Sequence, residues 1–269
     1  MARLGIAFHG MVFSRVRVEN LAYELPSTRV TSRSIEASLA ETYARLGIPQ
    51  GCIEMLVGVL ERRFWDEGNS DIATLAAKAD RAVYEQSGRA AELRARTGLV
   101  VSTSVSKDFI EPSVAALVRG QLQLPAECDA FDVGNACLGF LNGIELASQQ
   151  IELGLVDVAL VVAAESSRHC VSRAIEKLRA PTATMAEFKE TLPTLTLGSG
   201  TVAMLLVHDS IASTAHRVIG SRNFRRIVFY SADPWKLALE PAKPPRKTSF
   251  EVTETVLEAA PWRAELETA

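Results

Sequence analysis

Apolar and polar residues recur along the chain with two periods, one typical of strands and one typical of helices. Short apolar runs predict strands over residues 13–23, 98–105, 131–133, 156–165 and 196–207. Apolar residues at helical spacing predict helices over residues 32–46, 70–86 and 112–122, and one more that begins near Leu138. Because strands and helices follow each other in turn, we expect an α/β fold with a mostly parallel mixed sheet covered on both faces.

One stretch, DAFDVGNACL from Asp129 to Leu138, places a cysteine where a short apolar strand gives way to a helix. A thiol at the first turn of a helix lies in the positive field of the helix dipole, which favours the nucleophilic thiolate. Small neighbours, among them Gly134 and Gly139, leave room for a substrate. Cys137 is therefore a candidate acyl-accepting nucleophile. The alternative is that it packs in the core, as free cysteines commonly do.

Composition narrows the class of protein. Of 269 residues, 48% are hydrophobic, which suits one large domain or two small ones, and a net charge of −3 argues against nucleic-acid binding. Cys52, Cys128, Cys137 and Cys170 lack the spacing of a metal site, so we expect reduced thiols in a cytoplasmic protein. The sequence shows no signal-peptide pattern and no apolar run long enough to span a membrane.

The character of the chain changes near Gly220. Beyond that point the strand–helix rhythm stops, and three prolines, Pro241, Pro244 and Pro245, interrupt any helix. We therefore expect residues 222–269 to form an irregular or disordered tail that does not belong to the fold.

Four segments resemble the thiolase superfamily, and more narrowly its beta-ketoacyl-ACP synthase III branch. They are DVGNACLGF around Cys137, SVSKDFIEPSVAALV at 104–118, ALVVAAESS at 159–167 and TLGSGTVAMLLV at 196–207. Within that branch the chain looks like the OleA-type enzymes, which condense two acyl-CoA molecules head to head into a beta-keto acid. The resemblance covers roughly residues 12–221, which we expect to form a thiolase-like N-terminal domain.

The resemblance implies roles for particular residues. Cys137 would carry the acyl thioester, and Glu111 would reach across a dimer interface to act as the base in the partner's site. Asn135, Gly198 and Gly200 would shape the substrate site. From the residues alone, Glu111 is equally a charge that stabilises the start of a helix, and glycines at a strand entrance often only permit close packing.

The same resemblance implies substrates and partners. We expect acyl-CoA or acyl-ACP as substrate, no cofactor, and a homodimer or a pairing with another thiolase-like chain. The interface would contain the Glu111 loop and the strand at 130–133. Trp65 with Arg62 and Arg63 would line the mouth for the nucleotide end of CoA, or would be a solvated edge.

Thiolase-fold enzymes have two similar halves, and the resemblance here is to the N-terminal half only. It implies that a second half supplies a histidine and an asparagine, and none of the chain's histidines lies in a similar segment: His9, His169, His208 and His216. We therefore expect one αβα half, with apolar residues of the helix after Cys137 exposed on one side. Three interpretations stay open: an OleA-like acyltransferase of lipid biosynthesis, a beta-ketoacyl-ACP synthase III of fatty acid or polyketide synthesis, and a truncated or non-catalytic thiolase-like chain.

Overall fold

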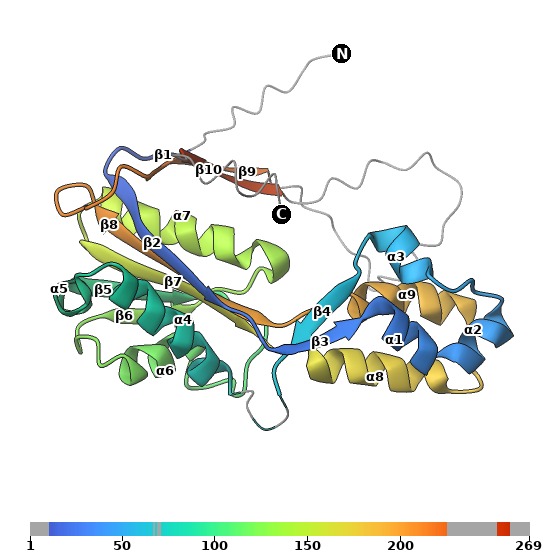
Figure 1. Cartoon of the computed structure of the whole chain (residues 1–269). Helices are drawn as coiled ribbons and strands as arrows, with labels where there is room; N and C mark the ends of the chain where they lie inside the picture. Colours follow the sequence, from blue (N-terminus) through green and yellow to red (C-terminus); the bar gives the residue numbers. More distant parts are fainter. Residues whose placement is uncertain (1–10, 67, 69–70, 225–251, 259–269) are drawn as a thin grey trace, which may run out of the picture.

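The computed structural model describes residues 11–66, 68, 71–224 and 252–258, which form two lobes side by side (Figure 1). The sheet lobe contains β1 (Met11–Val12), β2 (Val16–Glu24), α4 (Ile72–Gln86), α5 (Ala90–Arg96), β5 (Thr97–Ser102), α6 (Val114–Gln121), β6 (Asp129–Asp132), the 3-10 turn η1 (Ala136–Leu138), α7 (Gly139–Glu152), β7 (Val158–Glu165), β8 (Gly200–His208), β9 (Arg217–Phe224) and β10 (Val252–Glu258). The helical lobe contains β3 (Thr28–Thr31), α1 (Ser32–Ser38), α2 (Ala40–Leu46), α3 (Cys52–Val57), β4 (Glu61–Phe64), α8 (Arg168–Arg179) and α9 (Met185–Leu195).

The central sheet is mixed, and its strands lie in the order β1-β9-β2-β8-β7-β5-β6, with β10 paired to β9. β5 runs parallel to both β6 and β7. The pairs that β8 forms with β2 and β7, and those that β9 forms with β1, β2 and β10, are antiparallel. The predicted fold class is confirmed, but the expectation of mostly parallel strands is wrong. β8 runs antiparallel to both of its neighbours, β2 and β7. Antiparallel neighbours do not need the crossover connection that a parallel pair requires.

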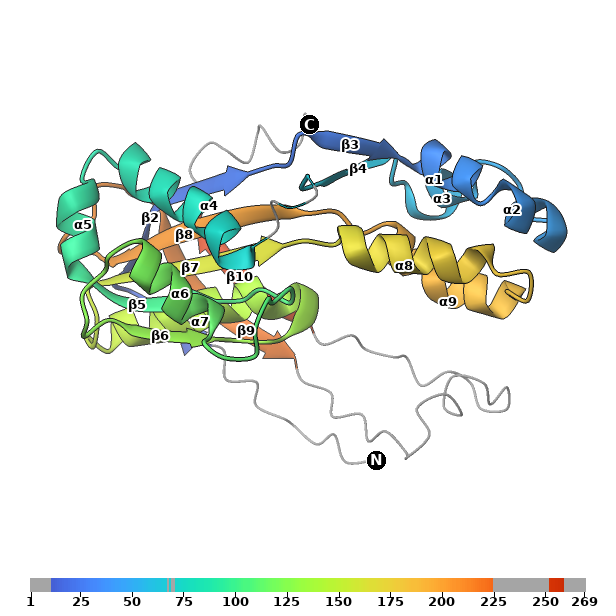
Figure 2. The same ribbon diagram turned by 90° about the horizontal axis from the view of Figure 1, so that it is seen from below.

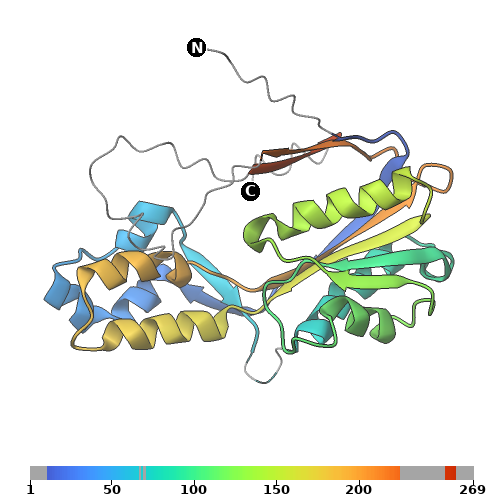
Figure 3. The same ribbon diagram turned by 180° about the vertical axis from the view of Figure 1, so that it is seen from behind.

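Helices cover both faces of this sheet, as predicted. In Figure 2 α4, α5 and α6 lie on the viewer's side of the sheet, and Figure 3 shows α7 on the opposite face. One apolar core lies between α4, α6 and the sheet, where Leu75, Val83 and Val118 meet Leu160. A second core lies between α7 and the sheet. Each strand or helix predicted for this lobe matches an observed element within a few residues, although Val133 lies just beyond the end of β6.

The helical lobe is built from two insertions in the sheet lobe, one between β2 and α4 and one between β7 and β8. The helix predicted over residues 32–46 is broken into α1 and α2 at Leu39, whose side chain is buried in the core of this lobe. Thr31 caps α1 by accepting a hydrogen bond from the Ser34 N–H. The lobe's other elements are too short or too polar to stand out from the sequence pattern.

The predicted irregular tail needs correction where the structure describes it. β9 continues through residue 222 to Phe224, and β10 pairs with it in antiparallel register from Val252↔Phe224 to Glu258↔Arg217. The predicted boundary at 221 therefore falls inside a strand, because pairing satisfies the backbone there. The three prolines lie outside the described residues, as do the rest of residues 225–251 and 259–269.

The helix α7 is less bare than the sequence suggested. Ile144 is buried, Phe140 and Leu141 are half-buried against the second core, and β10 contacts the helix. Figure 1 shows β10 passing over α7 on the side away from the sheet. The expectation of one fully exposed side of α7 is therefore too strong.

Gly143 lets α7 approach the sheet closely. A Cβ built there would lie 2.7 Å from Thr103 Cγ2 and 2.8 Å from Val161 Cγ1, closer than side chains tolerate. We expect Gly143→Ala to lower the free energy of unfolding by about 1–3 kcal/mol through overpacking, measured by urea unfolding. Gly120→Ala is the control. It lies in α6 with nothing within 4 Å of the added methyl group, so it should raise stability by about 0.5–1 kcal/mol. Equal effects would contradict the close approach.

The carboxyl group of Asp80, in α4, is fully buried. Neither of its oxygens forms a hydrogen bond with a described residue. Burial raises its pKa well above the usual value of 3.8. The folded chain therefore holds a proton that the unfolded chain releases, and stability falls as the pH rises above that usual value. We expect wild-type stability, relative to Asp80→Asn, to fall by up to about 1.4 kcal/mol per pH unit. Urea unfolding between pH 4 and 8 measures this, and parallel pH profiles would contradict it.

Candidate active site at one end of the sheet

The last residues of β5, β6 and β7 and the first residue of β8 meet at one end of the central sheet. In the parallel ladder Ser102 at the end of β5 pairs with Asp132 at the end of β6 and with Val162 in β7. Glu165, the last residue of β7, pairs with Gly200, the first residue of β8. The segments that carry the predicted site residues therefore all adjoin this end of the sheet. Ligands of many α/β proteins bind at the carboxyl ends of the strands.

Cys137 lies in η1, between the end of β6 and the start of α7, and its side chain is exposed. The alternative of a core cysteine is therefore wrong for Cys137, whereas Cys52 and Cys128 are buried. The preceding residue, Ala136, has a φ of 42°, a left-handed conformation that is uncommon outside glycine. Such strain occurs preferentially at functional sites, because surrounding structure must hold it.

The helix α7 follows this turn directly, and the N–H of its first residue, Gly139, donates to the Ala136 carbonyl of the turn. Its N-cap residue is Leu138, and no side chain caps the first turn of the helix. Main-chain N–H groups at such an end attract negative charge, including a thiolate or an oxyanion. Gly139 brings the helix close to the sheet, since a Cβ there would lie 3.1 Å from the Thr103 carbonyl oxygen. The arrangement suits nucleophilic chemistry by a cysteine.

Glu111 lies in the loop between β5 and α6, and its side chain is exposed. The alternative role, as a charge at the start of α6, is already filled by other residues. The Asp132 carboxylate accepts hydrogen bonds from the Val114 N–H (3.1 Å) and the Ala115 N–H (2.9 Å), and Ser113 Oγ accepts from the Ala116 N–H (3.1 Å). Glu111 is therefore available for another role.

The Gly198–Gly200 turn joins the two lobes. The Ser199 N–H donates to the Arg63 carbonyl at 2.8 Å, and its Oγ accepts from the Ser167 N–H at 3.0 Å. A Cβ at Gly198 would lie 3.4 Å from Arg62 Cβ, so close packing accounts for part of this turn. Asn135 shapes the turn before Cys137 by donating from Nδ2 to Asn142 Oδ1 at 2.6 Å.

Trp65 and Arg62 are buried, so neither sequence interpretation, a CoA mouth or a solvated edge, holds for them. The Trp65 indole N–H donates to the Glu165 carbonyl at 3.0 Å, and an Arg62 guanidinium N–H donates to Ser32 Oγ at 3.0 Å. Burial lowers the pKa of Arg62. Arg63 is half-buried and donates to the Pro26 carbonyl at 2.9 Å. The Trp65 bond ties the segment after β4 to β7 of the sheet lobe, whereas the Arg62 bond lies within the helical lobe.

The described histidines, His169, His208 and His216, lie outside the β6–α7 segment that carries Cys137. His169 is exposed at the start of α8, and His208 Nδ1 lies 2.8 Å from Ser210 Oγ. His216 is half-buried, and His9 lies outside the described residues. Nor do the described residues bring three histidine, cysteine or acidic side chains together in a way that could hold a metal ion. No described helix is long and apolar enough to cross a membrane.

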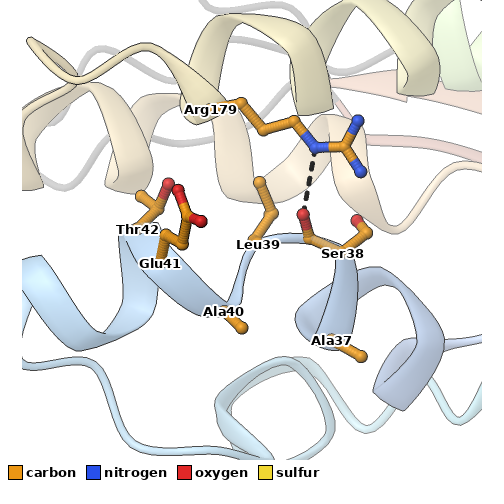
Figure 4. A pocket seen from close by; sticks show the side chains of 7 residues that line it. All are labelled: Ala37, Ser38, Leu39, Ala40, Glu41, Thr42 and Arg179. Atoms are coloured by element: carbon orange, nitrogen blue, oxygen red, sulfur yellow. Dashed lines mark hydrogen bonds between the residues drawn. The ribbon is translucent and has the colours of Figure 1, made fainter.

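A hollow of about 320 Å³ lies in the helical lobe, away from the cysteine (Figure 4). It is lined by residues 37–42 and by Arg179, whose Nε–H donates to the Ser38 carbonyl at 3.0 Å. Its lining belongs to α1, α2 and α8, and contains none of the predicted site residues. The candidate site remains the end of the sheet.

The sequence analysis missed two acidic residues at this end of the sheet, Asp132 and Glu165. Asp132 directly precedes VGNACL, and Glu165 ends β7. Both hold the loop that carries Glu111 through hydrogen bonds described below. The only sequence signal was their place at the ends of predicted strands, where functional side chains of α/β proteins gather.

The fold and the exposed cysteine at a strand–helix junction define a thiolase-like α/β protein. Residues 131–223 match the family 3-oxoacyl-[acyl-carrier-protein (ACP)] synthase III. Over 213 residues the chain is 37% identical to an acyl-CoA:acyl-CoA alkyltransferase of Xanthomonas campestris pv. campestris, an alignment that covers 78% of this chain and 61% of that protein.

Solved structures of Xanthomonas campestris OleA are also similar. One variant matches with a TM-score of 0.75 at 33% identity, over 85% of this chain and 67% of that one. Another variant, with bound lauric acid and lauroyl-CoA, matches with a TM-score of 0.74 at 34% identity, over 79% and 63% of the two chains. The chain belongs to the synthase III branch of the thiolase superfamily, and spans 61% of the length of the curated Xanthomonas relative.

Proposed function

We propose that this chain carries the nucleophile of an acyl-CoA condensing enzyme that joins two acyl chains head to head into a beta-keto acid. The observation that carries the proposal is the exposed Cys137 in the turn before the uncapped start of α7. It is supported by the 37% identity to an acyl-CoA:acyl-CoA alkyltransferase.

The first step is transfer of an acyl group to Cys137. The thiolate attacks the carbonyl carbon of an acyl-CoA, and the bond between that carbon and the CoA sulfur breaks. CoA leaves as the thiolate and takes up a proton, and Cys137 keeps the acyl group as a thioester. The start of α7, which no side chain caps, supports this step, because main-chain N–H groups at a helix N-terminus stabilise developing negative charge.

The second step is carbon–carbon bond formation. The Glu111 carboxylate of a partner subunit removes a proton from the carbon next to the carbonyl of a second acyl-CoA. The resulting carbanion attacks the thioester carbonyl on Cys137, and the carbon–sulfur bond breaks to return the Cys137 thiolate. Hydrolysis of the remaining CoA thioester then gives the beta-keto acid and free CoA.

The proposed substrate site also includes Asn135, Gly198 and Gly200. Asn135 holds the turn that carries Cys137, and the two glycines flank Ser199 at the same end of the sheet. A Cβ at Gly198 would contact Arg62 and one at Gly200 would contact Leu25, so glycine keeps both positions small beside the proposed site. No cofactor is needed for either step.

The chain is further proposed to act as a homodimer or with another thiolase-like chain, in the cytoplasm. β6 is an edge strand of the central sheet, and unpaired edges invite a partner strand. Beside Glu111, the loop exposes the apolar side chains of Phe109 and Ile110. Exposed apolar groups next to an edge strand favour a subunit interface there.

Release of CoA tests the proposal. Mixed with a long-chain acyl-CoA, the purified chain should release CoA in a burst of about one equivalent per cysteine site, followed by slower turnover to beta-keto acid. Faster acylation from acyl-ACP than from acyl-CoA would favour the synthase III alternative. Absence of both burst and turnover would favour the non-catalytic alternative and contradict the proposal.

A further inference from the structure

The segment that presents Glu111 has little main-chain support of its own. Residues 105–113 join β5 to α6, and Phe109, Ile110 and Glu111 are exposed, with 92% of the Ile110 surface accessible. Within the described residues, no hydrogen bond between main-chain groups holds residues 105–112. A segment of this kind samples many conformations unless side chains of neighbouring elements fix it.

Glu165, at the end of β7, fixes the first part of the segment. Its carboxylate accepts from the Val105 N–H at 2.7 Å and the Ser106 N–H at 3.0 Å. It also accepts from the Ser106 hydroxyl at 2.7 Å. Its main-chain carbonyl accepts from the Trp65 indole, so the strand end that carries this carboxylate is itself held.

Asp132, at the end of β6, fixes both sides of the exposed tip. One carboxylate oxygen lies 2.7 Å from Lys107 Nζ, before the tip. The same carboxylate accepts from the Val114 N–H and the Ala115 N–H in the first turn of α6, beyond the tip. Its side chain is only 9% exposed, so water screens these bonds weakly.

A third carboxylate completes the set of anchors. Asp108 accepts from the Ile72 N–H at the start of α4 at 2.6 Å. The anchored positions therefore run without a gap from residue 105 to residue 108 and resume at Val114. Between them, residues 109–112, which include Glu111, have no such anchor among the described residues, whereas Ser113 is held as the N-cap of α6.

We propose that Asp132 and Glu165 are positioning residues for the condensation step, which hold Glu111 at a fixed place relative to the cysteine turn. The inference rests on the proposed role of Glu111. Asp132 lies five positions before Cys137 on the strand that leads into its turn. The next residue, Val133, donates its N–H to the Ser102 carbonyl at 2.8 Å, so one strand end orders both the nucleophile's turn and the Glu111 segment.

Asp132→Asn is the direct test in the full chain. Asparagine has the same size, but its amide nitrogen cannot accept the hydrogen bonds that the second carboxylate oxygen accepts. We expect condensation to fall about 10- to 100-fold, because misplacing a reacting group by about 1 Å costs that much. Acylation of Cys137 should stay within about twofold of wild type. Hydrogen exchange of amides 105–115 should become at least about 10-fold faster.

Asp129→Asn is the matched control, because Asp129 is exposed on the same strand and no described N–H or cation hydrogen-bonds to its carboxylate, which only acts electrostatically on Cys128. It should change neither condensation nor exchange. Glu165→Gln should speed exchange at Val105 and Ser106 while leaving the α6 amides unchanged, so it tests the second anchor separately.

A double variant distinguishes positioning from general stabilisation. Once Glu111→Gln has removed the carboxylate, adding Asp132→Asn should cost no further condensation activity, because there is nothing left to place. Losses that multiply would overturn the proposal, as would unchanged exchange in Asp132→Asn or an equal loss of acylation. If the wild-type chain acylates but never condenses, the proposed function fails, while the exchange experiment still decides whether these carboxylates fix the segment.

Discussion

Cys137→Ala is expected to abolish transfer of an acyl group from a long-chain acyl-CoA to the protein. The thiolate is the attacking atom, and the described residues around the η1 turn offer no second thiol. Loss of a covalent nucleophile costs at least about 10³-fold in rate. The CoA burst should therefore vanish. Since the side chain is exposed, the free energy of unfolding should change by less than about 0.5 kcal/mol.

Cys170→Ala provides the control for this prediction. Cys170 is the other exposed cysteine among the described residues, and it lies in α8 of the helical lobe. The burst should be unchanged in this variant. A burst that survives in Cys137→Ala, or disappears in Cys170→Ala, would show that the acyl group is accepted elsewhere.

Glu111→Gln is expected to separate the two chemical steps. Thioester formation on Cys137 should continue at the wild-type rate, while condensation falls about 10²- to 10⁴-fold, the usual contribution of a general base. Single-turnover release of CoA measures the first step, and quantified beta-keto product measures the second. Because Glu111 caps nothing in α6, the variant should fold like wild type. Equal loss of both steps would mean that Glu111 has a structural role.

Mixed dimers test whether Glu111 acts on the partner's site. Neither Cys137→Ala nor Glu111→Gln should condense alone. Subunits exchanged between them should form dimers in which one site has an intact Cys137 and receives Glu111 from the other chain. About half of such a dimer's sites should recover. No recovery despite proven subunit exchange would contradict a base supplied across the interface.

The sequence predicted the sheet lobe well because its elements are strongly periodic. β7 is a continuous buried apolar run, and α4 begins at a capping Asp71 and presents one apolar face, so local signals and tertiary packing agree. The same holds for the junction that exposes Cys137, where small residues mark the turn. Strand direction was harder, because an apolar run reads the same in parallel and antiparallel pairs.

The helical lobe and the anchors of the Glu111 loop could not be read from the chain. α8 is mostly polar and buries only Val171, Ala174 and Leu178. Arg62 is charged yet buried, which only its partners in the folded lobe explain. Asp132 and Glu165 act through hydrogen bonds to residues that are distant in sequence, up to 60 positions for Val105. Such contacts exist only once the sheet has brought its strand ends together.

The site of acylation tests the account most directly. The full chain is incubated with a long-chain acyl-CoA, denatured, digested at low pH to preserve thioesters, and analysed by peptide mass spectrometry. The account predicts the mass of the acyl group on the peptide that contains Cys137, and its loss after hydroxylamine treatment. An adduct on Cys52, Cys128 or Cys170 with none on Cys137 would contradict it.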